Sequence, residues 1–264
     1  MKRVLLGLWS YRHFIISSIK NEFKTRFIRS KLGGAWIVLH PLAQVLIYAL
    51  VLSKVMQAKL PGVASEYAYP IYLLSGMVAW TLFSELLGRL LNIFIENANL
   101  LKKLAFPKLA LPVIAIGSSL INYILLLFAM YGVFISLGHY PFKEILWLIP
   151  LTVIVLIFTV GLGLLLGILN LFVRDVGQVV SIVLQFWFWL TPIVYAPSIV
   201  PQKYHTLLYA NPMTSIVEGF QNVLLYQKAP EILPLLYPAF LGLLLLGIGL
   251  WLFVKTKEEM TDVL

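Results

Sequence analysis

The residues best suited to ligand recognition are aromatic and lie in the second half of one long apolar run. Residues 185–195 read QFWFWLTPIVY. Aromatic rings offer flat faces on which bases stack, and the apolar C–H faces of sugars suit them too. Aromatic side chains near a membrane interface also form an anchoring belt. The residues alone leave both interpretations open.

Few polar groups interrupt the apolar runs. Glu85 and Arg89 are spaced i, i+4, so we expect them to pair and neutralise each other. His40 and Gln44 have the same spacing, and a contact between helices is the expected use of such a pair, with a substrate role as the alternative. His205 has no second ligand, which favours a hydrogen-bonded structural role over a metal site.

No catalytic motif is present in the sequence. It contains no G-x-x-x-x-G-K-[ST], H-E-x-x-H or G-x-S-x-G pattern and no paired-carboxylate constellation of a catalytic site. It has no Cys, which excludes disulfides, thiolate metal sites and cysteine nucleophiles. Chains of intramembrane Asp, Glu or Lys, as in proton-driven pumps, are also missing. We therefore expect no enzyme, cofactor or metal, and an energy source outside this chain.

The composition is that of an integral membrane protein. Of 264 residues 61% are hydrophobic and 12% are charged. The net charge is +9, but the charges lie at the ends of apolar runs, so we expect lipid head groups and not nucleic acid as partners.

Six stretches can cross the hydrocarbon, which takes about 20 helical residues. They are residues 32–53, 67–84 with a continuation to 95, 109–142, 145–173, 176–202 and 232–254. These spans predict one all-α transmembrane domain, 1–264, in which the step from Gly163 to Gly167 lets two helices approach closely. An even number of spans places both termini on one side. Fourteen Lys and Arg residues lie on that side and five on the other, so both termini are predicted to be cytoplasmic.

Three shorter segments lie outside the spans. In residues 11–31, five apolar residues fall on one helical arc among six basic residues and one acid, Glu22: Ile15, Ile16, Ile19, Phe23 and Phe27. This pattern predicts an amphipathic helix in the membrane surface, with a basic segment that only sets topology as the alternative.

The second segment, 96–108, predicts a short cytoplasmic helix that Asn97 and Asn99 suit as a start. Its apolar edge, Leu100, Leu101 and Leu104, fits either the groove of a partner protein or the bilayer surface. The third segment, 198–227, contains Asn211-Pro212 as a helix start, and its helix 213–225 is too short to span a bilayer. It predicts a re-entrant or interfacial hairpin on the outer side.

Four parts of the sequence resemble the permeases of ATP-binding-cassette exporters for bacterial cell-surface polysaccharides. They are RSKLGGAWIVLHPL at 29–42, YPIYLLSGMVAW at 69–80, NANLLKKLAFPKLALP at 97–112, and residues 174–221, from RDVGQVVSIVLQFWFWLTPIVY to YANPMTSIVEGFQ. The likeness is strongest to O-antigen exporter permeases, with teichoic-acid and capsule exporter permeases close behind. Members of this family commonly carry a basic residue where Gln221 stands, so an anion-binding role of the hairpin is not carried over.

The resemblance implies a homodimer of six-span subunits that pairs with two cytoplasmic ATPase subunits and moves a lipid-linked glycan across the inner membrane. The implied ATPase coupling segment is 96–104: Glu96, Asn97, Asn99, Leu100, Leu101, Lys102, Lys103 and Leu104. The implied outer gate is 198–226, with Tyr204, His205, Tyr209, Met213 and Phe220. As a hypothesis of mechanism, aromatic rings would hold the glycan by stacking, and the candidate channel residues are Trp36, Tyr48, Phe186, Trp187, Trp189 and Tyr195.

Three other functions compete with this one. A lipid or drug exporter of the same superfamily predicts the same helices with fewer aromatic residues along the path. A membrane-embedded glycosyltransferase predicts an acidic pair near one membrane face, but no second carboxylate accompanies Asp175. A passive channel predicts transport without nucleotide.

Overall fold

The computed structural model describes residues 9–27, 67–103, 107–257 and 259–260, together with residues 35, 36, 39, 42 and 43. The first predicted span, 32–53, lies outside these residues except for those five positions. All regular secondary structure in the described residues is helical, which agrees with the predicted all-α class.

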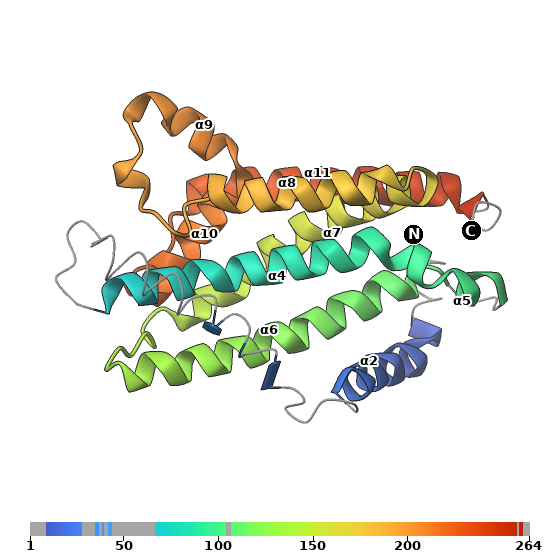
Figure 1. Ribbon diagram of the computed structural model, residues 1–264, viewed down its shortest axis with the longest axis horizontal. Coiled ribbons are helices and arrows are strands. Elements are labelled where there is room, and N and C mark those ends of the chain that lie inside the picture. The colour runs from blue at the N-terminus through green and yellow to red at the C-terminus, as the bar shows by residue number, and fades with distance from the viewer. Residues whose placement is uncertain are drawn as a thin grey trace.

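The helices are numbered as in Figure 1. Their bounds are α2 Arg12–Phe27, α4 Ala68–Glu96, α5 Ala98–Lys103, α6 Ala110–Ser136, α7 Leu148–Phe172, α8 Asp175–Leu190, α9 His205–Ala210, α10 Pro212–Leu224 and α11 Ile232–Thr256, with short 3-10 turns η2 Ile145–Trp147, η3 Pro197–Ile199 and η4 Gln202–Tyr204.

Four helices in the described residues are long and apolar enough to cross a membrane. They are α4, α6, α7 with its leading turn η2, and α11. They confirm the helices predicted at 67–95, 109–142, 145–173 and 232–254. α6 ends at Ser136, earlier than predicted, because the chain turns at Gly138, whose φ of 74° a glycine adopts without strain.

The predicted fifth span, 176–202, is wrong in its extent. α8 contains 16 residues and ends at Leu190. Thr191 is extended, with φ −99° and ψ 135°, since the residue before a proline avoids the helical region and Pro192 follows. Residues 191–196 are therefore not helical.

The long helices lie side by side and alternate in direction along the chain (Figure 1). α5 and the C-terminal end of α11 lie at one end of this bundle, called here the α5 end, and α9 and α10 lie at the other, the α10 end. α4 is the most buried candidate span and α11 the least. α4 therefore forms the centre, with α6, α7 and α10 packed against it.

Glycines allow α7 to approach its two neighbours closely. A Cβ at Gly163 would lie 2.6 Å from Leu90 Cδ1 on α4. On another side of α7, a Cβ at Gly161 would lie 2.5 Å from the backbone nitrogen of Leu246 on α11. The predicted close approach at Gly163 and Gly167 is confirmed, since Gly167 also faces the backbone of Leu90.

Candidate functional site

The short helix α5 leaves α4 at a turn formed by Asn97. The Asn97 backbone carbonyl accepts hydrogen bonds from the N–H groups of Leu100 and Leu101, both at 3.0 Å. Its side-chain amide donates to the Ile93 carbonyl of α4 at 2.8 Å. The Asn97 side chain therefore caps the C-terminal end of α4. The sequence predicted the other role, a cap at the start of α5, which the Asn97 side chain does not fill.

One leucine of α5 belongs to the bundle core. Leu101 is 5% exposed and packs in a buried cluster that also contains Phe94 of α4, Leu111 of α6 and Phe253 of α11. Leu100 is half-buried, whereas Asn99 and Lys102 are exposed. Leu104 and the side chain of Lys103 lie outside the described residues. Asn99 and Lys102 are thus the described side chains of α5 most accessible to a partner.

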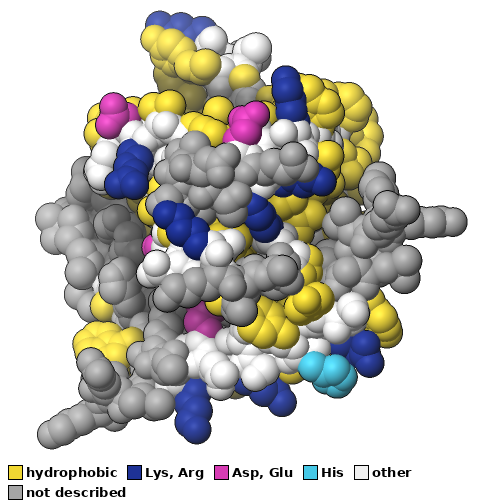
Figure 2. Space-filling view, turned by 90° about the vertical axis from the view of Figure 1, so that its right-hand side faces the viewer, with side chains coloured by type: hydrophobic (Ala, Val, Ile, Leu, Met, Phe, Trp, Pro, Cys, Tyr) yellow, Lys and Arg dark blue, Asp and Glu magenta, His cyan; other side chains and the backbone are white. Residues whose placement is uncertain are grey.

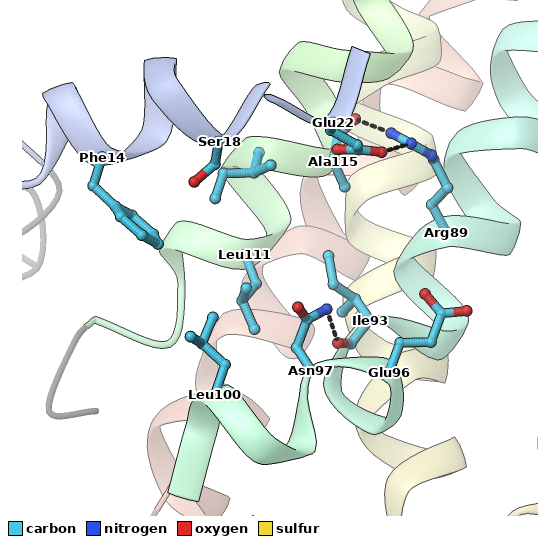
Figure 3. Close-up of a pocket in the computed structure, with 11 residues that line it drawn as sticks. Phe14, Ser18, Glu22, Arg89, Ile93, Glu96, Asn97, Leu100, Leu111 and Ala115 are labelled. Atoms are coloured by element: carbon cyan, nitrogen blue, oxygen red, sulfur yellow. Dashed lines mark hydrogen bonds and ion pairs between the residues drawn. The ribbon is translucent and has the colours of Figure 1, made fainter. Parts of the chain in front are cut away.

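A cavity of about 440 Å³ lies where α2, α4, α5 and α6 meet. Figure 3 shows Ser18 and Glu22 of α2, Arg89 of α4, Leu100 of α5 and Leu111 of α6 around it. Both the predicted surface helix and the predicted coupling helix therefore line one cavity at the α5 end.

An ionic network joins α2 to the bundle beside this cavity. Arg89 forms an ion pair with Glu22 of α2, and its Nε lies 3.9 Å from Glu85 Oε1. The Ser118 hydroxyl donates to Glu22 at 2.7 Å, and the Asn122 amide donates to Glu85 at 2.6 Å. The predicted pairing of Glu85 with Arg89 is confirmed, but sequence reasoning missed Glu22. The feature that could have identified Glu22 is that it is the one acidic residue among six basic residues in 11–31.

The apolar arc of α2 is divided between the bundle and the surface. Ile15 is buried, and Ile19 lies against Gly117 of α6. Ile16 is 50% exposed. The side chains of Phe23 and Phe27 lie outside the described residues. At least two members of the arc thus attach α2 to the protein.

The aromatic residues of α8 point in different directions. Phe186 and Trp189 are 67% and 55% exposed, and they share an outward stripe with Val179, Ile182, Val183 and Leu190. Trp187 is half-buried, with its ring centroid 5.2 Å from that of Phe83 and 6.3 Å from that of Phe158. Phe188 is also buried. Helical geometry turns successive residues by about 100°, so neighbours in sequence cannot share one face.

Trp187 also connects α8 to the start of α10. Its indole N–H donates to Asn211 Oδ1 at 2.7 Å, and the same oxygen accepts from the Met213 backbone N–H at 3.0 Å, as a helix N-cap does. The Asn211 amide donates to the Thr191 hydroxyl at 2.9 Å. Three segments of the chain are therefore held together by Asn211.

The non-helical segment 191–196 is held by side chains of the central helices. Tyr69 donates to the Val194 carbonyl at 2.7 Å, and Tyr72 donates to the carbonyls of Pro192 at 2.9 Å and Tyr195 at 2.8 Å. Buried carbonyls outside helices need such partners. α4 thus fixes this segment, and the side chain of Tyr195 is half-buried.

The candidate gate residues fall into two groups. Met213 and Phe220 of α10 are fully buried in the core at the α10 end. Tyr204 and Tyr209 are 49% and 40% exposed, and a ring nitrogen of His205 hydrogen bonds with the Val200 carbonyl at 2.9 Å. No metal-binding group of three His, Asp or Glu side chains occurs in the described residues. Of the candidate channel residues, Trp36 is 52% exposed and Tyr48 lies outside the described part of the chain.

Protonation of Glu218 is expected to stabilise the α10 end. Burial raises the pKa of Glu218 above its ordinary value of 4.5, although the Tyr209 hydroxyl donates to it at 2.9 Å. Because the folded pKa is raised, the stabilisation is complete below about pH 4.5 and is lost as the pH rises through the folded value. We expect the melting temperature to fall with rising pH in this range. Glu218→Gln should flatten the profile and Glu144→Gln should not; a profile unchanged by Glu218→Gln would contradict the assignment.

Comparison with known proteins places the chain in a family. A profile of the ABC-2 type transporter family matches residues 14–225. The chain is 29% identical over 265 aligned residues to the O-antigen export system permease protein RfbA of Myxococcus xanthus, with 99% of both proteins covered. It is 29% identical over 245 residues to the protein of the same name from Klebsiella pneumoniae, with 92% of both covered. It is 26% identical over 239 residues to the polysialic acid transport protein KpsM of Escherichia coli, and the alignment covers 90% of this chain and 91% of KpsM.

The family profile runs from α2 to the end of α10, and the described residues contain four helices able to cross a membrane. This chain belongs to the ABC-2 type transporter family, as a multi-pass membrane permease without a catalytic domain.

Proposed function

We propose that this chain is the permease subunit of an ABC exporter that moves a lipid-linked polysaccharide of O-antigen type across the inner membrane, driven by a separate ATPase. The observation that carries this proposal is the similarity, over 99% of the chain, to a permease named for O-antigen export. The similarity to KpsM makes a capsular polysaccharide the alternative substrate.

In this proposal the working unit is a homodimer of six-span subunits. The spans are 32–53, α4, α6, α7, α8 together with the non-helical segment 191–196 that follows it, and α11, and both termini are cytoplasmic because Lys and Arg are concentrated on their side. The α5 end then faces the cytosol, and the hairpin 198–226 forms the outer gate. α2 lies at the cytosolic membrane surface, where its basic residues meet anionic lipids.

The central helix α4 provides a physical route from the ATPase to the gate. Its 29 residues form a helix about 44 Å long, at about 1.5 Å per residue. Its C-terminal end carries α5, which Leu101 attaches to the core. Its N-terminal end holds segment 191–196 through Tyr69 and Tyr72. A displacement of α5 by the ATPase would therefore reach the gate through one packed element.

The outward stripe of α8 supports the channel assignment. Phe186 and Trp189 project from the subunit, so a second copy facing this stripe would place rings on both sides of a seam. Stacking of a sugar on such a ring contributes about 1 kcal/mol, which is weak enough for a polymer to move onward. Trp187 contributes differently, by connecting α8 to the gate helix α10.

Reversing the exposed charge of α5 tests the proposal. We expect the combined variant Asn99→Asp and Lys102→Glu to reduce co-purification with the ATPase subunit about tenfold, because both side chains are exposed on the proposed docking helix. ATP-driven movement of a lipid-linked glycan into proteoliposomes should fall with it. Leu101→Asp is not a suitable test, since a buried charge there would unfold the α5 end.

The matched control is Lys203→Glu, an exposed charge reversal at the α10 end that should leave association unchanged. Undiminished association of the α5 variant would remove the coupling assignment. Glycan movement by the permease without ATPase and ATP would remove the proposed function.

A further inference from the structure

The cavity at the α5 end is amphipathic. Its apolar wall is formed by Phe14 of α2, Leu100 of α5, and Ile93, Leu111 and Ile114 of α4 and α6. Its charged groups are Glu22, Arg89 and Glu96. Figure 3 shows Phe14 and Leu100 at the left of this space and Arg89 and Glu96 at the right, with Ile93 beside Glu96. A ligand that fills it must therefore combine apolar and charged parts.

The charges of the cavity are not balanced. The guanidinium of Arg89 already pairs with Glu22 and lies near Glu85. The Glu96 carboxylate also acts on this guanidinium electrostatically, so one cation faces three carboxylates, and no hydrogen bond or ion pair holds the Glu96 side chain to another described residue. Glu96 is also the last residue of α4, where the helix dipole is negative and a carboxylate is unfavourable without a cation. The cavity therefore attracts a cationic hydrogen-bond donor.

The protein surface at the α5 end is more basic than acidic. Figure 2 shows this end with more Lys and Arg side chains, in blue, than Asp and Glu side chains, in magenta. Among the described residues of this end, Lys102, Arg174, Lys255 and Lys257 are exposed, as are the acids Glu96, Asp175 and Glu259. An anionic group is attracted to this face, and a cationic group is attracted into the cavity. A ligand with both charges a few atoms apart satisfies both requirements.

We propose that this cavity binds the headgroup of a phospholipid that carries a primary ammonium. The ammonium donates to Glu96, the phosphate lies towards the basic surface, and the glycerol backbone contacts Phe14 and Leu100. A quaternary ammonium has no N–H to donate to Glu96. An anionic lipid without an amine brings no positive charge, so the carboxylate of Glu96 repels it. This inference needs only the membrane setting of the chain and does not rest on the export activity.

Lipid competition on the purified permease tests this site without ATPase or glycan. The protein in detergent is given phosphatidylethanolamine, phosphatidylcholine and phosphatidylglycerol with identical acyl chains in equal amounts, and bound lipid is measured by native mass spectrometry. We expect the wild type to bind phosphatidylethanolamine about tenfold better than either competitor, the ratio given by one charge-assisted hydrogen bond. Glu96→Gln should reduce this preference to about twofold or less.

Two variants separate this site from general effects of charge. Glu96→Asp keeps the carboxylate and should keep most of the preference, and Glu231→Gln removes an exposed acid at the other end and should keep all of it. Glu96 is exposed, so all three variants should melt at the temperature of the wild type.

Equal binding of the three lipids by the wild type, or an undiminished preference in Glu96→Gln, would overturn the proposal. The same competition on the complex with the ATPase decides between a lipid and a basic side chain of the partner. If the complex still prefers phosphatidylethanolamine, the result supports lipid binding in the cavity. If the preference is lost on assembly, a side chain of the partner occupies the cavity and the proposal is overturned.

Discussion

Replacing Trp187 with alanine is expected to lower the free energy of unfolding by about 3 kcal/mol, the usual cost of removing a packed aromatic side chain. The ring contacts Phe83 and Phe158, and the indole N–H donates to Asn211. Removal leaves a void between α8 and the core and weakens the cap of α10. Export should be lost if α10 belongs to the outer gate, as the proposed function requires, because α10 is then no longer held in place. Thermal unfolding followed by fluorescence measures the first effect, and glycan movement into proteoliposomes measures the second.

Trp189 is the matched comparison, two residues along the same helix. Because it is 55% exposed, Trp189→Ala should change the free energy of unfolding by less than about 1 kcal/mol. Export should nevertheless fall severalfold if the outward stripe of α8 contacts the glycan, as the proposed function requires. Unchanged export by a correctly inserted Trp189→Ala protein would remove Trp189 from the channel. A stable Trp187→Ala protein with normal export would contradict the role of Trp187 in holding α10.

A second large effect is expected at Gly161, where leucine should destabilise the protein by about 3 kcal/mol or more. A Cβ at this position lies 2.5 Å from the Leu246 nitrogen and 2.8 Å from the Gly242 oxygen, both backbone atoms of α11. The backbone of a packed helix cannot move away from the new side chain as a flexible side chain could. A leucine at position 161 therefore forces α7 and α11 apart. The yield of monodisperse protein and its melting temperature should both drop.

Gly247→Leu on α11 is the control for hydrophobicity and size. No atom lies within 4 Å of a Cβ built there, so the new side chain enters open space at the outer surface of the bundle. Its melting temperature should stay within a few degrees of the wild type. Equal stability of the Gly161 and Gly247 variants would show that α7 and α11 do not meet at these glycines.

The sequence correctly predicted the helices that are specified by neighbouring residues alone. α4, α6, α7 and α11 arise from long charge-free apolar runs, which have few alternatives to a membrane helix. The extent of α8 was misjudged because Ile193 and Val194 continue the apolar composition past the break. The Thr191-Pro192 pair was the better signal, since it acts on the backbone conformation and not on hydropathy.

The candidate sites were less predictable because they depend on contacts distant in sequence. Glu22 and Arg89 are 67 residues apart, and nothing in either segment specifies the other. α8 carries aromatic residues on several faces, so composition could not separate the packed Trp187 from the exposed Trp189. The sequence placed Leu101 on an apolar edge that faces a partner protein or lipid. In the structure Leu101 belongs to the core, because Phe253 of α11 lies in the same buried cluster.

The short length of α8 has a consequence for the energetics of the lipid barrier. Sixteen helical residues extend about 24 Å, whereas the hydrocarbon layer is about 30 Å thick. Beyond Leu190 the chain continues as non-helical backbone, and its carbonyls accept hydrogen bonds from Tyr69 and Tyr72 inside the protein. Their dipoles are thereby matched by donors, which avoids the several kcal/mol that an unpaired carbonyl would cost in a hydrocarbon environment.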